Sequence, residues 1–470
     1  MSSEPRELVR DDYVPKDSYI SKEFADLEKR KLWTRVWQVA CREEELAKVG
    51  DYVTYDICDN SFVIVRSAED TIRAFYNVCM HRGRRLTSNC GHARVLHCNF
   101  HGWRWNLDGS INRILDRSDW DGCPSVNDDD FALREVKCET WGGFVYINPD
   151  PEAEPLADYL APVPQFIDPF EFSKLRYRWY VSVRLPCNWK VALEAFNEGY
   201  HVAATHPQLL DHMGDDVTRS TVYGKHGMFG YPTAQRPLGQ PSPRTGRPMT
   251  EDSRPGMIAF FDEMNTTLRA IYTERSTEAS RRLMTEASAD EDAGALFGKL
   301  IGFQKEAAER AAAGWPDIAL DQVIRAGSDW HVFPNQVFLM YFDGALCYRA
   351  RPDGDNPDSC IYDIWSLQRY AAGAQPLLDR QIFYGQDDWK GFDKVSIILA
   401  QDFANMEQVQ KGMKVDGFQA SRTSPLQETS VSNLHRWIRH YVLDHPISES
   451  GREGAPDMDT PVSFASAGRM

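Results

Sequence analysis

The sequence predicts an α+β protein with a small antiparallel β domain and a larger domain in which helices flank an antiparallel sheet. Two observations predict this class. The chain has 470 residues, which is too long for one ordinary hydrophobic core. Its apolar pattern also changes along its length, since residues 45–155 show short β-type runs and residues 156–445 mix helical and strand-like segments. We therefore expect two domains with these bounds.

The small domain is predicted from short runs of strand-forming residues separated by turn residues. DYVTYDI, SFVIVR, TIRAFYNV and CETWGGFVYIN have the length and composition of strands. Before them, residues 18–41 have roughly helical apolar spacing, with Ser21 as a candidate cap. We expect residues 1–44 to form a helical segment that lies on the larger domain.

The larger domain is predicted to begin with a strand near Arg176 and a helix that ends before Pro207. An insertion at residues 211–315 follows, which is predicted to be irregular over 211–255 and mostly helical over 256–313. The remaining elements are predicted as strands within 328–352 and 360–370 and helices at 397–412 and 431–443. The tail at 446–470 is rich in Ser, Glu, Gly, Pro and Asp and is predicted to be disordered.

Charge and composition exclude several classes of function. A net charge of −16 argues against a nucleic-acid partner, which requires a basic face. No window approaches 18 uninterrupted apolar residues, so we expect no transmembrane helix. The polar, acidic start predicts no export signal and a cytoplasmic protein. Ten cysteines then indicate thiols and metal sites instead of disulfides.

The first candidate metal site consists of two Cys/His pairs, Cys79-x-His81 and Cys98-x-x-His101. Two thiolates and two imidazoles satisfy a tetrahedral zinc ion, or they hold a [2Fe–2S] cluster with two Cys on one iron and two His on the other. Arg-Gly and Gly-Trp directly follow the two histidines. Glycine at these positions allows tight loops with exposed N–H groups, which favours the iron–sulfur interpretation.

The second candidate site is built around His201 and His206. Five helical steps of about 100° separate the two side chains by about 140°, so one metal binds both only if the helix ends or distorts between them. A carboxylate would complete a facial triad, the arrangement that suits ferrous iron and leaves positions for dioxygen. Glu198 and Asp402 are both candidates for that carboxylate. A di-iron site would need a second Glu-x-x-His, and the sequence contains none.

These motifs resemble the large (alpha) subunits of Rieske non-haem iron aromatic-ring-hydroxylating oxygenases. C-x-H-R-G with C-x-x-H-G-W resembles the Rieske cluster motif. The stretch 188–206, NWKVALEAFNEGYHVAATH, resembles the catalytic signature, and DFANME at 402–407 resembles the late helix of the third ligand. The resemblance covers roughly residues 20–440 and implies a helix-grip-like catalytic domain.

The resemblance implies a role for each motif residue. Cys79, His81, Cys98 and His101 would hold one [2Fe–2S] cluster per subunit, and His201, His206 and Asp402 would hold one Fe(II). Glu198 stands where the family usually has Asp, and it would link a cluster histidine of the neighbouring subunit to an iron histidine. Some relatives that act on quaternary amines are similar in having Glu there.

The expected function is that of a terminal oxygenase that consumes O2 and electrons from NAD(P)H. The resemblance implies a reductase partner, with or without a ferredoxin, and a homotrimer, with or without a small beta subunit. Apolar residues near the iron favour a small hydrophobic, aromatic or polycyclic substrate that undergoes cis-dihydroxylation or monohydroxylation. The candidate pocket residues are Phe196, Asn197, Phe333, Asn335 and Phe338.

Three alternatives stay open at this point. A monooxygenase or demethylase would act on an N- or O-alkyl or quaternary amine substrate. A zinc-stabilised binding protein would have no redox chemistry, and an electron-transfer subunit would use its large domain only to dock partners.

Overall fold

The computed structural model describes residues 8–123, 127–230 and 236–447, which divide into two compact units. One unit comprises Leu27–Tyr159, and the other combines the chain up to Asp26 with the chain from Leu160 onward. The sequence placed the first boundary at residue 44, whereas residues 27–44 belong to the first unit in the structure. The predicted disordered tail lies outside the described residues from 448 on.

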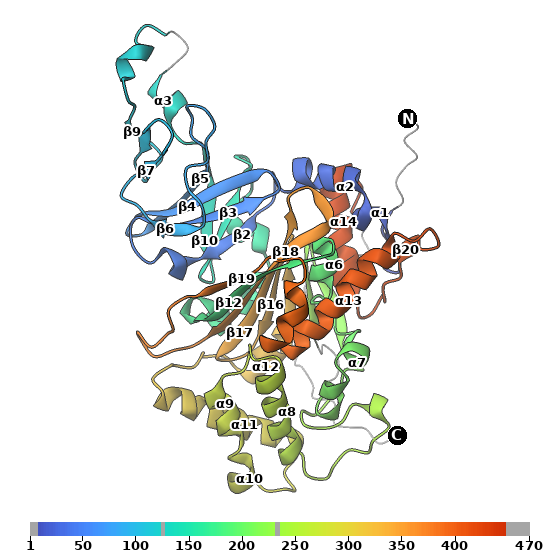
Figure 1. Cartoon of the computed structure of the whole chain (residues 1–470). Helices are drawn as coiled ribbons and strands as arrows, with labels where there is room; N and C mark the ends of the chain where they lie inside the picture. Colours follow the sequence, from blue (N-terminus) through green and yellow to red (C-terminus); the bar gives the residue numbers. More distant parts are fainter. Residues whose placement is uncertain (1–7, 124–126, 231–235, 448–470) are drawn as a thin grey trace. The chain divides into compact units, whose positions relative to one another are not determined.

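The first unit is a small β structure, and its strands agree with the predicted ones. Its main sheet has seven strands in the spatial order β2 (Gln38–Arg42), β11 (Phe144–Asn148), β10 (Glu135–Trp141), β5 (Thr71–Tyr76), β4 (Asn60–Ala68), β3 (Asp51–Ile57) and β6 (Cys90–His92). All neighbouring pairs are antiparallel. A second sheet contains β7 (Leu96–His97), β8 (Arg104–Trp105) and β9 (Ile111–Arg113) (Figure 1).

The predicted helix over residues 18–41 is wrong in its second half. Ser21 does cap a helix, since its Oγ accepts a hydrogen bond from the Phe24 N–H at 3.1 Å. The helical turns are α1 (Asp17–Ile20), α2 (Lys22–Leu27) and a π-helical turn (Glu28–Leu32). The chain then extends into β2, and residues 36–42 are all buried. A strand buried on both faces is mostly apolar without alternation, so periodicity does not distinguish it from a helix.

The second unit is built on an eight-stranded sheet. Its strands in spatial order are β13 (Arg219–Tyr223), β14 (His226–Gly230), β15 (Asp329–Val332), β16 (Gln336–Met340), β17 (Gly344–Asp353), β18 (Asn356–Gln368), β12 (Arg176–Leu185) and β19 (Arg380–Phe383). Only the β12–β19 pair is parallel among these strands. The hairpin β13–β14 corrects the prediction that residues 211–255 are irregular. Its tight turn contains Gly224 at a positive φ of 59°, a conformation that glycine adopts without a steric cost.

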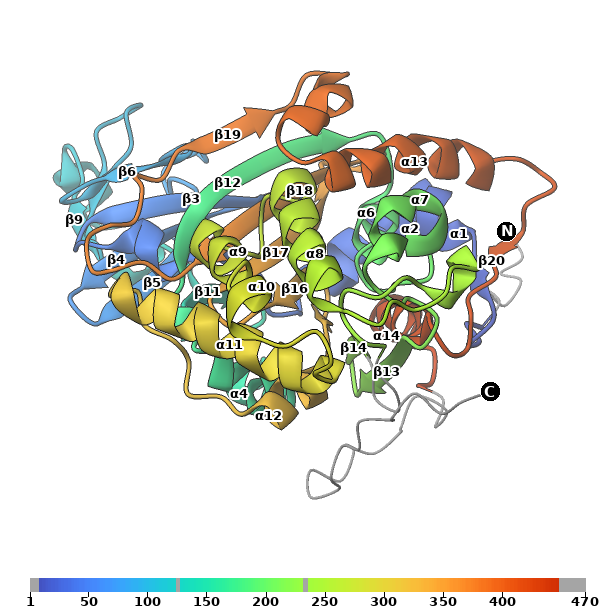
Figure 2. The same cartoon turned by 90° about the horizontal axis from the view of Figure 1, so that it is seen from below.

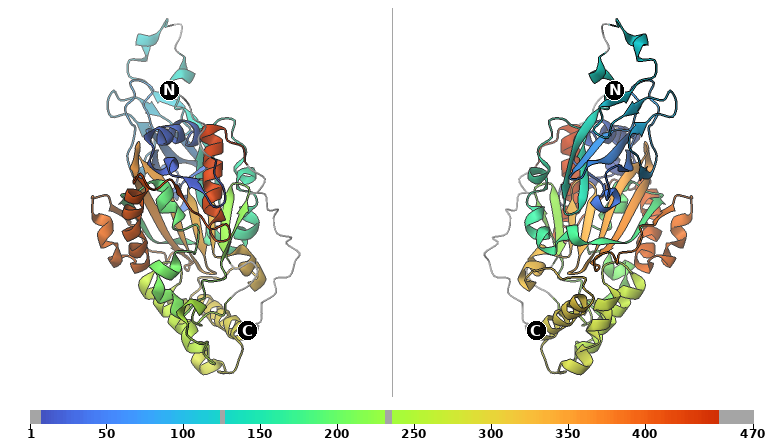
Figure 3. Two further views of the ribbon diagram at one scale, coloured as in Figure 1. Left: turned by 90° about the vertical axis from the view of Figure 1, so that its right-hand side faces the viewer. Right: turned by 90° about the vertical axis from the view of Figure 1, so that its left-hand side faces the viewer.

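Two groups of helices accompany this sheet. The helices α6 (Trp189–Glu194), α13 (Ile397–Met413) and α14 (Thr429–Leu443) contact its strands, and α13 also contacts α6. The helices of the insertion gather near one end of the strands, as Figures 1 and 2 show: α8 (Arg254–Thr267), α9 (Glu274–Ser280), α10 (Leu283–Glu286) and α11 (Ala293–Arg310). Figure 3 shows two further views of the strands and helices, and α14 contacts the edge strands β13 and β14. This arrangement confirms the predicted α+β class.

The strand register shows which side chains share a face of the large sheet. Directly opposed residues of antiparallel strands point to the same face, so Tyr348 of β17 shares a face with Val337 of β16. We call this the helix-covered face, because Phe196, which follows α6, contacts Tyr348 with ring centroids 4.3 Å apart. The described part of the chain contains no helix with the length and apolar character needed to cross a membrane.

Two candidate metal centres

The first centre is formed by two loops with the same backbone hydrogen bonds. In one loop, the Cys79 N–H donates to Arg84 O, and the Gly83 N–H donates back to Cys79 O. In the other, the Cys98 N–H donates to Trp103 O, and the Gly102 N–H donates to Cys98 O. Gly83 and Gly102 have φ values of 75° and 74°, a region that favours glycine. The backbone of both loops therefore favours the glycines that follow His81 by two positions and His101 by one.

The four side chains of these loops meet as one pair of thiols and one pair of imidazoles. Cys79 and Cys98 are buried and contact each other through their thiols. The rings of His81 and His101 lie with their centroids 4.5 Å apart, and Trp103 stacks on His81 at 4.9 Å. The Nδ1 atoms of both histidines are buried and have no hydrogen-bond partner among the described residues. Two sulfurs and two available ring nitrogens fit a [2Fe–2S] cluster.

The environment of the two thiols is asymmetric. Burial raises the pKa of the Cys79 thiol. Burial also opposes ionisation of Cys98, but the backbone N–H groups of Phe100 and His101 and the contact with Cys79 lower its pKa overall. N–H groups that stabilise a thiolate are what a sulfur-bound cluster requires.

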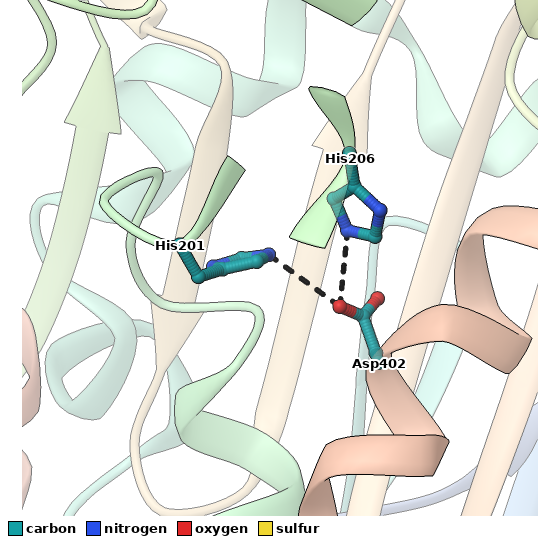
Figure 4. A group of neighbouring side chains, drawn as sticks. All are labelled: His201, His206 and Asp402. Atoms are coloured by element: carbon teal, nitrogen blue, oxygen red, sulfur yellow. Dashed lines mark ion pairs between the residues drawn. The ribbon is translucent and has the colours of Figure 1, made fainter. Parts of the chain in front are cut away.

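The second centre brings together His201, His206 and Asp402 (Figure 4). One ligand atom from each lies within 4.8 Å of the others. The Asp402 Oδ1 is 3.0 Å from His206 Nε2 and 3.5 Å from His201 Nε2. All three side chains point toward one another, and both His206 and Asp402 are buried. Two imidazoles and one carboxylate fit a facial triad for a divalent iron.

Hydrogen bonds to the outer ring nitrogens orient both imidazoles. His201 Nδ1 lies 2.6 Å from Glu198 Oε1, and His206 Nδ1 lies 2.8 Å from Gln401 Oε1. Acceptors on Nδ1 leave each Nε2 free to bind a metal and fix the plane of the ring. Glu198 therefore occupies the position of a supporting carboxylate, while Asp402 is the carboxylate within the triad. Sequence reasoning missed Gln401, although it directly precedes Asp402.

The chain reaches this geometry because the predicted helix over 188–207 is broken. Helix α6 ends at Glu194, and α7 spans only Val202–Thr205. Between them, the Glu198 carboxylate accepts hydrogen bonds from the N–H groups of Tyr200 and His201. These hydrogen bonds allow the new helix α7 to begin after His201. Pro207 disfavours the helical conformation at His206, whose φ and ψ are −122° and 51°. The two histidines therefore flank α7, as binding to one metal requires.

The predicted pocket residues do not lie in one place. Phe196 contacts Tyr348 and stacks on Tyr362, on the helix-covered face. The side chain of Asn197 is buried, and neither of its polar atoms has a hydrogen-bond partner among the described residues. Phe333 instead stacks on Tyr441 of α14, and Asn335 donates its amide to Ala350 O.

Phe338 does not share the helix-covered face with Phe196. Phe338 opposes Cys347 in the register, so it points to the face opposite Tyr348 and contacts Phe172. That opposite face also contains Asp363, which binds Arg349 and Arg351 in a buried ion cluster. Burial raises the pKa of Asp363, but the arginines outweigh it and hold the pKa well below its usual range. These two arginines are thereby engaged away from the triad.

Two family descriptions match the chain. Residues 36–121 match the Rieske [2Fe-2S] domain, and residues 172–444 match the ring hydroxylating alpha subunit (catalytic domain). The second match covers more than half of the chain. The carnitine monooxygenase oxygenase subunit of Escherichia coli (strain K12) is 33% identical over 216 residues, which are 45% of this chain and 56% of that relative. The chain thus aligns with about half the length of this curated relative.

Solved structures resemble the whole fold. A quaternary ammonium Rieske monooxygenase in complex with L-carnitine has a TM-score of 0.62 and 18% identity, covering 94% of this chain and 100% of that one. A mutant naphthalene 1,2-dioxygenase bound to phenanthrene has a TM-score of 0.63 and 20% identity, covering 94% and 95%. The chain belongs to the family of ring-hydroxylating oxygenase alpha subunits, with a Rieske [2Fe–2S] domain and a non-haem iron catalytic domain.

Proposed function

We propose that this chain is the terminal oxygenase component of a Rieske monooxygenase that oxidises an N-alkylated, quaternary amine. The observation that carries the oxygenase proposal is the convergence of one ligand atom each from His201, His206 and Asp402 within 4.8 Å. Three protein ligands leave coordination positions for dioxygen. A zinc-stabilised binding protein does not require this second metal site. An electron-transfer subunit does not require a metal with coordination positions left for dioxygen.

The substrate class rests on the relatives and on one residue. The carnitine monooxygenase subunit acts, by its name, on a quaternary amine. The resemblance of the sequence adds that some relatives acting on quaternary amines have Glu at the position of Glu198, where the family usually has Asp. The two solved folds do not discriminate, since an amine oxygenase and a naphthalene dioxygenase give TM-scores of 0.62 and 0.63. The expected aromatic substrate therefore has less support than the amine.

We assign the metal-holding roles as follows. Cys79, His81, Cys98 and His101 would hold the cluster, and His201, His206 and Asp402 would hold the mononuclear iron. When bound, these groups supply electrons one at a time and a site for oxygen activation. Glu198 and Gln401 keep the Nδ1 protons of the two triad imidazoles in place and so present Nε2 to the metal.

The overall reaction needs an external electron source. One oxygen atom enters a C–H bond of a carbon attached to nitrogen, and the other leaves as water with two electrons and two protons. The hydroxylated carbon then separates as an aldehyde or ketone, and the nitrogen leaves as the amine. We propose that NAD(P)H supplies the electrons through a reductase, with or without a ferredoxin, and that the chain acts as a homotrimer. In the trimer, Glu198 would link a cluster histidine of the neighbouring subunit to His201 by hydrogen bonds.

The proposed function is tested with the purified full chain, a generic reductase and ¹⁸O-labelled dioxygen. L-carnitine, glycine betaine and naphthalene are supplied in parallel, and products are identified by mass. We expect labelled oxygen in the carbonyl product or alcohol of an amine substrate, and no product with Asp402→Ala. The matched control is Glu407→Gln, which alters an α13 carboxylate paired with Lys411.

Two results would overturn parts of the proposal. Naphthalene that gains two oxygens and two hydrogens, with both amines unchanged, would establish aromatic dihydroxylation. Full turnover in Asp402→Ala would contradict the triad assignment.

A further inference from the structure

Asp329 is a buried carboxylate that no part of the proposed metal chemistry uses. Asp329 is 2% exposed, and neither of its carboxylate oxygens has a hydrogen-bond partner among the described residues. Burial raises its pKa well above 3.8, and the negative charge of Glu198 raises it further. An ionised carboxylate without a partner is among the costliest groups to bury in a protein. A cation from outside the chain would compensate the charge of this carboxylate.

The strand register places Asp329 on the helix-covered face. Asp329 opposes Leu339 of β16, which opposes Leu346 of β17. Leu346 lies two residues before Tyr348, so its side chain points to the same face. This is the face on which Phe196 stacks, and Phe403, the residue after Asp402, contacts Tyr362 there at a ring distance of 6.0 Å. Asp329 and the triad therefore lie on the same side of the sheet.

Two phenol rings lie within electrostatic reach of both Asp329 and Asp402. Burial is the main cause that raises the pKa of Tyr348 and Tyr362, and the charges of Asp402 and Asp329 add to it in both residues. The two rings are stacked, with centroids 5.4 Å apart, and Phe196 adds a third ring. The Tyr362 hydroxyl is itself buried without a hydrogen-bond partner among the described residues.

Asn197 adds a second unsatisfied group, on the chain segment that contains the two triad histidines. Its side-chain oxygen and nitrogen are both buried without partners among the described residues, and it directly precedes Glu198. Buried polar groups in native proteins normally have partners, so several unsatisfied ones in one functional region indicate a site for a ligand.

We propose that Asp329 is the specificity-determining residue that pairs with the cationic nitrogen of the substrate. The inference rests on the proposed function and names the residue that recognises the ammonium group. A quaternary ammonium ion spreads its charge over its methyl groups and prefers an apolar, electron-rich surface, which the rings of Tyr348, Tyr362 and Phe196 provide. Asp329 supplies the opposite charge in the same desolvated region, and a neutral substrate of the same shape leaves that carboxylate unpaired.

Binding of isosteric ligands tests this inference without any turnover. Choline and 3,3-dimethyl-1-butanol have nearly the same shape, but only choline is charged. Isothermal titration of the full chain, loaded with iron and kept anaerobic, measures both, with tetramethylammonium as the bare cationic head. We expect choline to bind at least about tenfold more tightly than the neutral alcohol.

The variants separate recognition from a general effect of charge. Asp329→Asn keeps the shape of the side chain, and we expect it to weaken choline and tetramethylammonium about tenfold while the neutral alcohol changes less than about twofold. Asp317→Asn removes one exposed carboxylate and is expected to change none of these affinities. Thermal unfolding confirms that Asp329→Asn is folded.

The outcomes distinguish this inference from the proposed function. Equal affinity for choline and the alcohol, no binding of either cation, or unchanged cation binding in Asp329→Asn would each overturn the role of Asp329, even if oxygenation is observed. Cation binding that depends on Asp329 would support it even if the oxygenation assay yields no amine product, a result that would refute only the proposed reaction.

Discussion

The two candidate centres differ in how the chain assembles them. The cluster residues lie within residues 79–101, on two loops with matching backbone hydrogen bonds. The triad residues come from the ends of the short helix α7 and from α13, about two hundred positions later. One centre is therefore a local structure, whereas the other depends on how the large sheet and its helices are put together.

This difference has consequences for stability and for chemistry. Local loops need only their own turns and a few contacts such as those of Trp103. The triad needs α6, α7 and α13 in register, and its supporting groups Glu198 and Gln401 come from different elements. We expect substitutions around the triad to abolish iron binding or turnover while the cluster persists.

The largest expected effect follows removal of the triad carboxylate. Asp402→Ala takes away the one negative ligand, so mononuclear iron should be lost and turnover should fall below about 1%. The visible spectrum of the cluster should be retained, because its ligands belong to separate loops. Iron analysis and absorption spectroscopy of the same sample measure both. Loss of the cluster spectrum together with the iron would contradict the independence of the two centres.

Glu198→Gln is expected to have the next largest effect. Gln still accepts a hydrogen bond from His201 Nδ1 but removes the negative charge beside that ring, and product formation should fall about 10- to 100-fold. Stopped-flow reduction of the cluster by the reductase should be unchanged. Equal product rates in variant and wild type would remove the supporting role of this carboxylate.

Gln401→Leu tests the supporting group of the other imidazole. It removes the acceptor for His206 Nδ1, and we expect affinity for iron to fall about tenfold. Gln408→Leu, at an exposed position on the same helix, is the matched control. Competition with a chelator measures both. An equal effect of the two substitutions would indicate a general weakening of α13.

A smaller and opposite effect is expected for Asp329→Asn in the absence of ligand. Because the pKa of Asp329 is raised in the folded protein, the folded state binds a proton that the unfolded chain releases above about pH 4. Wild-type stability should therefore fall as pH rises from that value toward the raised pKa. The variant has no carboxylate to ionise at this position, so its stability should not fall in this way. Its free energy of unfolding should exceed that of wild type by about 1–3 kcal/mol at pH 8 and be nearly equal to it at pH 4.

Urea unfolding at both pH values measures this difference. A wild type more stable than the variant at pH 8 would show that Asp329 has a stabilising partner in the free protein.

The smallest expected effect concerns the cluster loops. Gly102→Ala meets no heavy atom within 4 Å of the new Cβ, so its cost is the strain of a positive φ alone, about 1 kcal/mol. The cluster content should remain that of the wild type, and thermal unfolding should show a slight loss of stability. Loss of the cluster in this variant would show that the loop does not tolerate the added Cβ, although no heavy atom lies close to it.

The sequence predicted the local features better than the distributed ones. The strands β3, β4 and β5 and the helix α13 follow from alternating or helical apolar patterns that match single elements. The predicted helix includes the buried strand β2, because a mostly apolar segment has no period that distinguishes a strand from a helix. Ser21, by contrast, was identified as a cap because capping depends on the residue and its neighbours alone.

The candidate site divides in the same way. Spacing identified the Cys/His pairs, whereas Asp402 was preferred to Glu198 only through the resemblance of DFANME to a late helix of the family. No local pattern shows that α13 lies against α6. The sequence does not determine the face of Phe338, because a strand offers two faces and its pattern does not say which one the helices cover. Asp329 carried no signal in the sequence, since only its burial without a partner sets it apart.

Metal and sulfide content of the purified full chain tests the central claim most directly. A cluster and a separate triad predict about three iron atoms and two acid-labile sulfides per chain, falling to about two iron atoms with unchanged sulfide in Asp402→Ala. Zinc without iron or sulfide, or an iron content that Asp402→Ala leaves unaltered, would contradict the account.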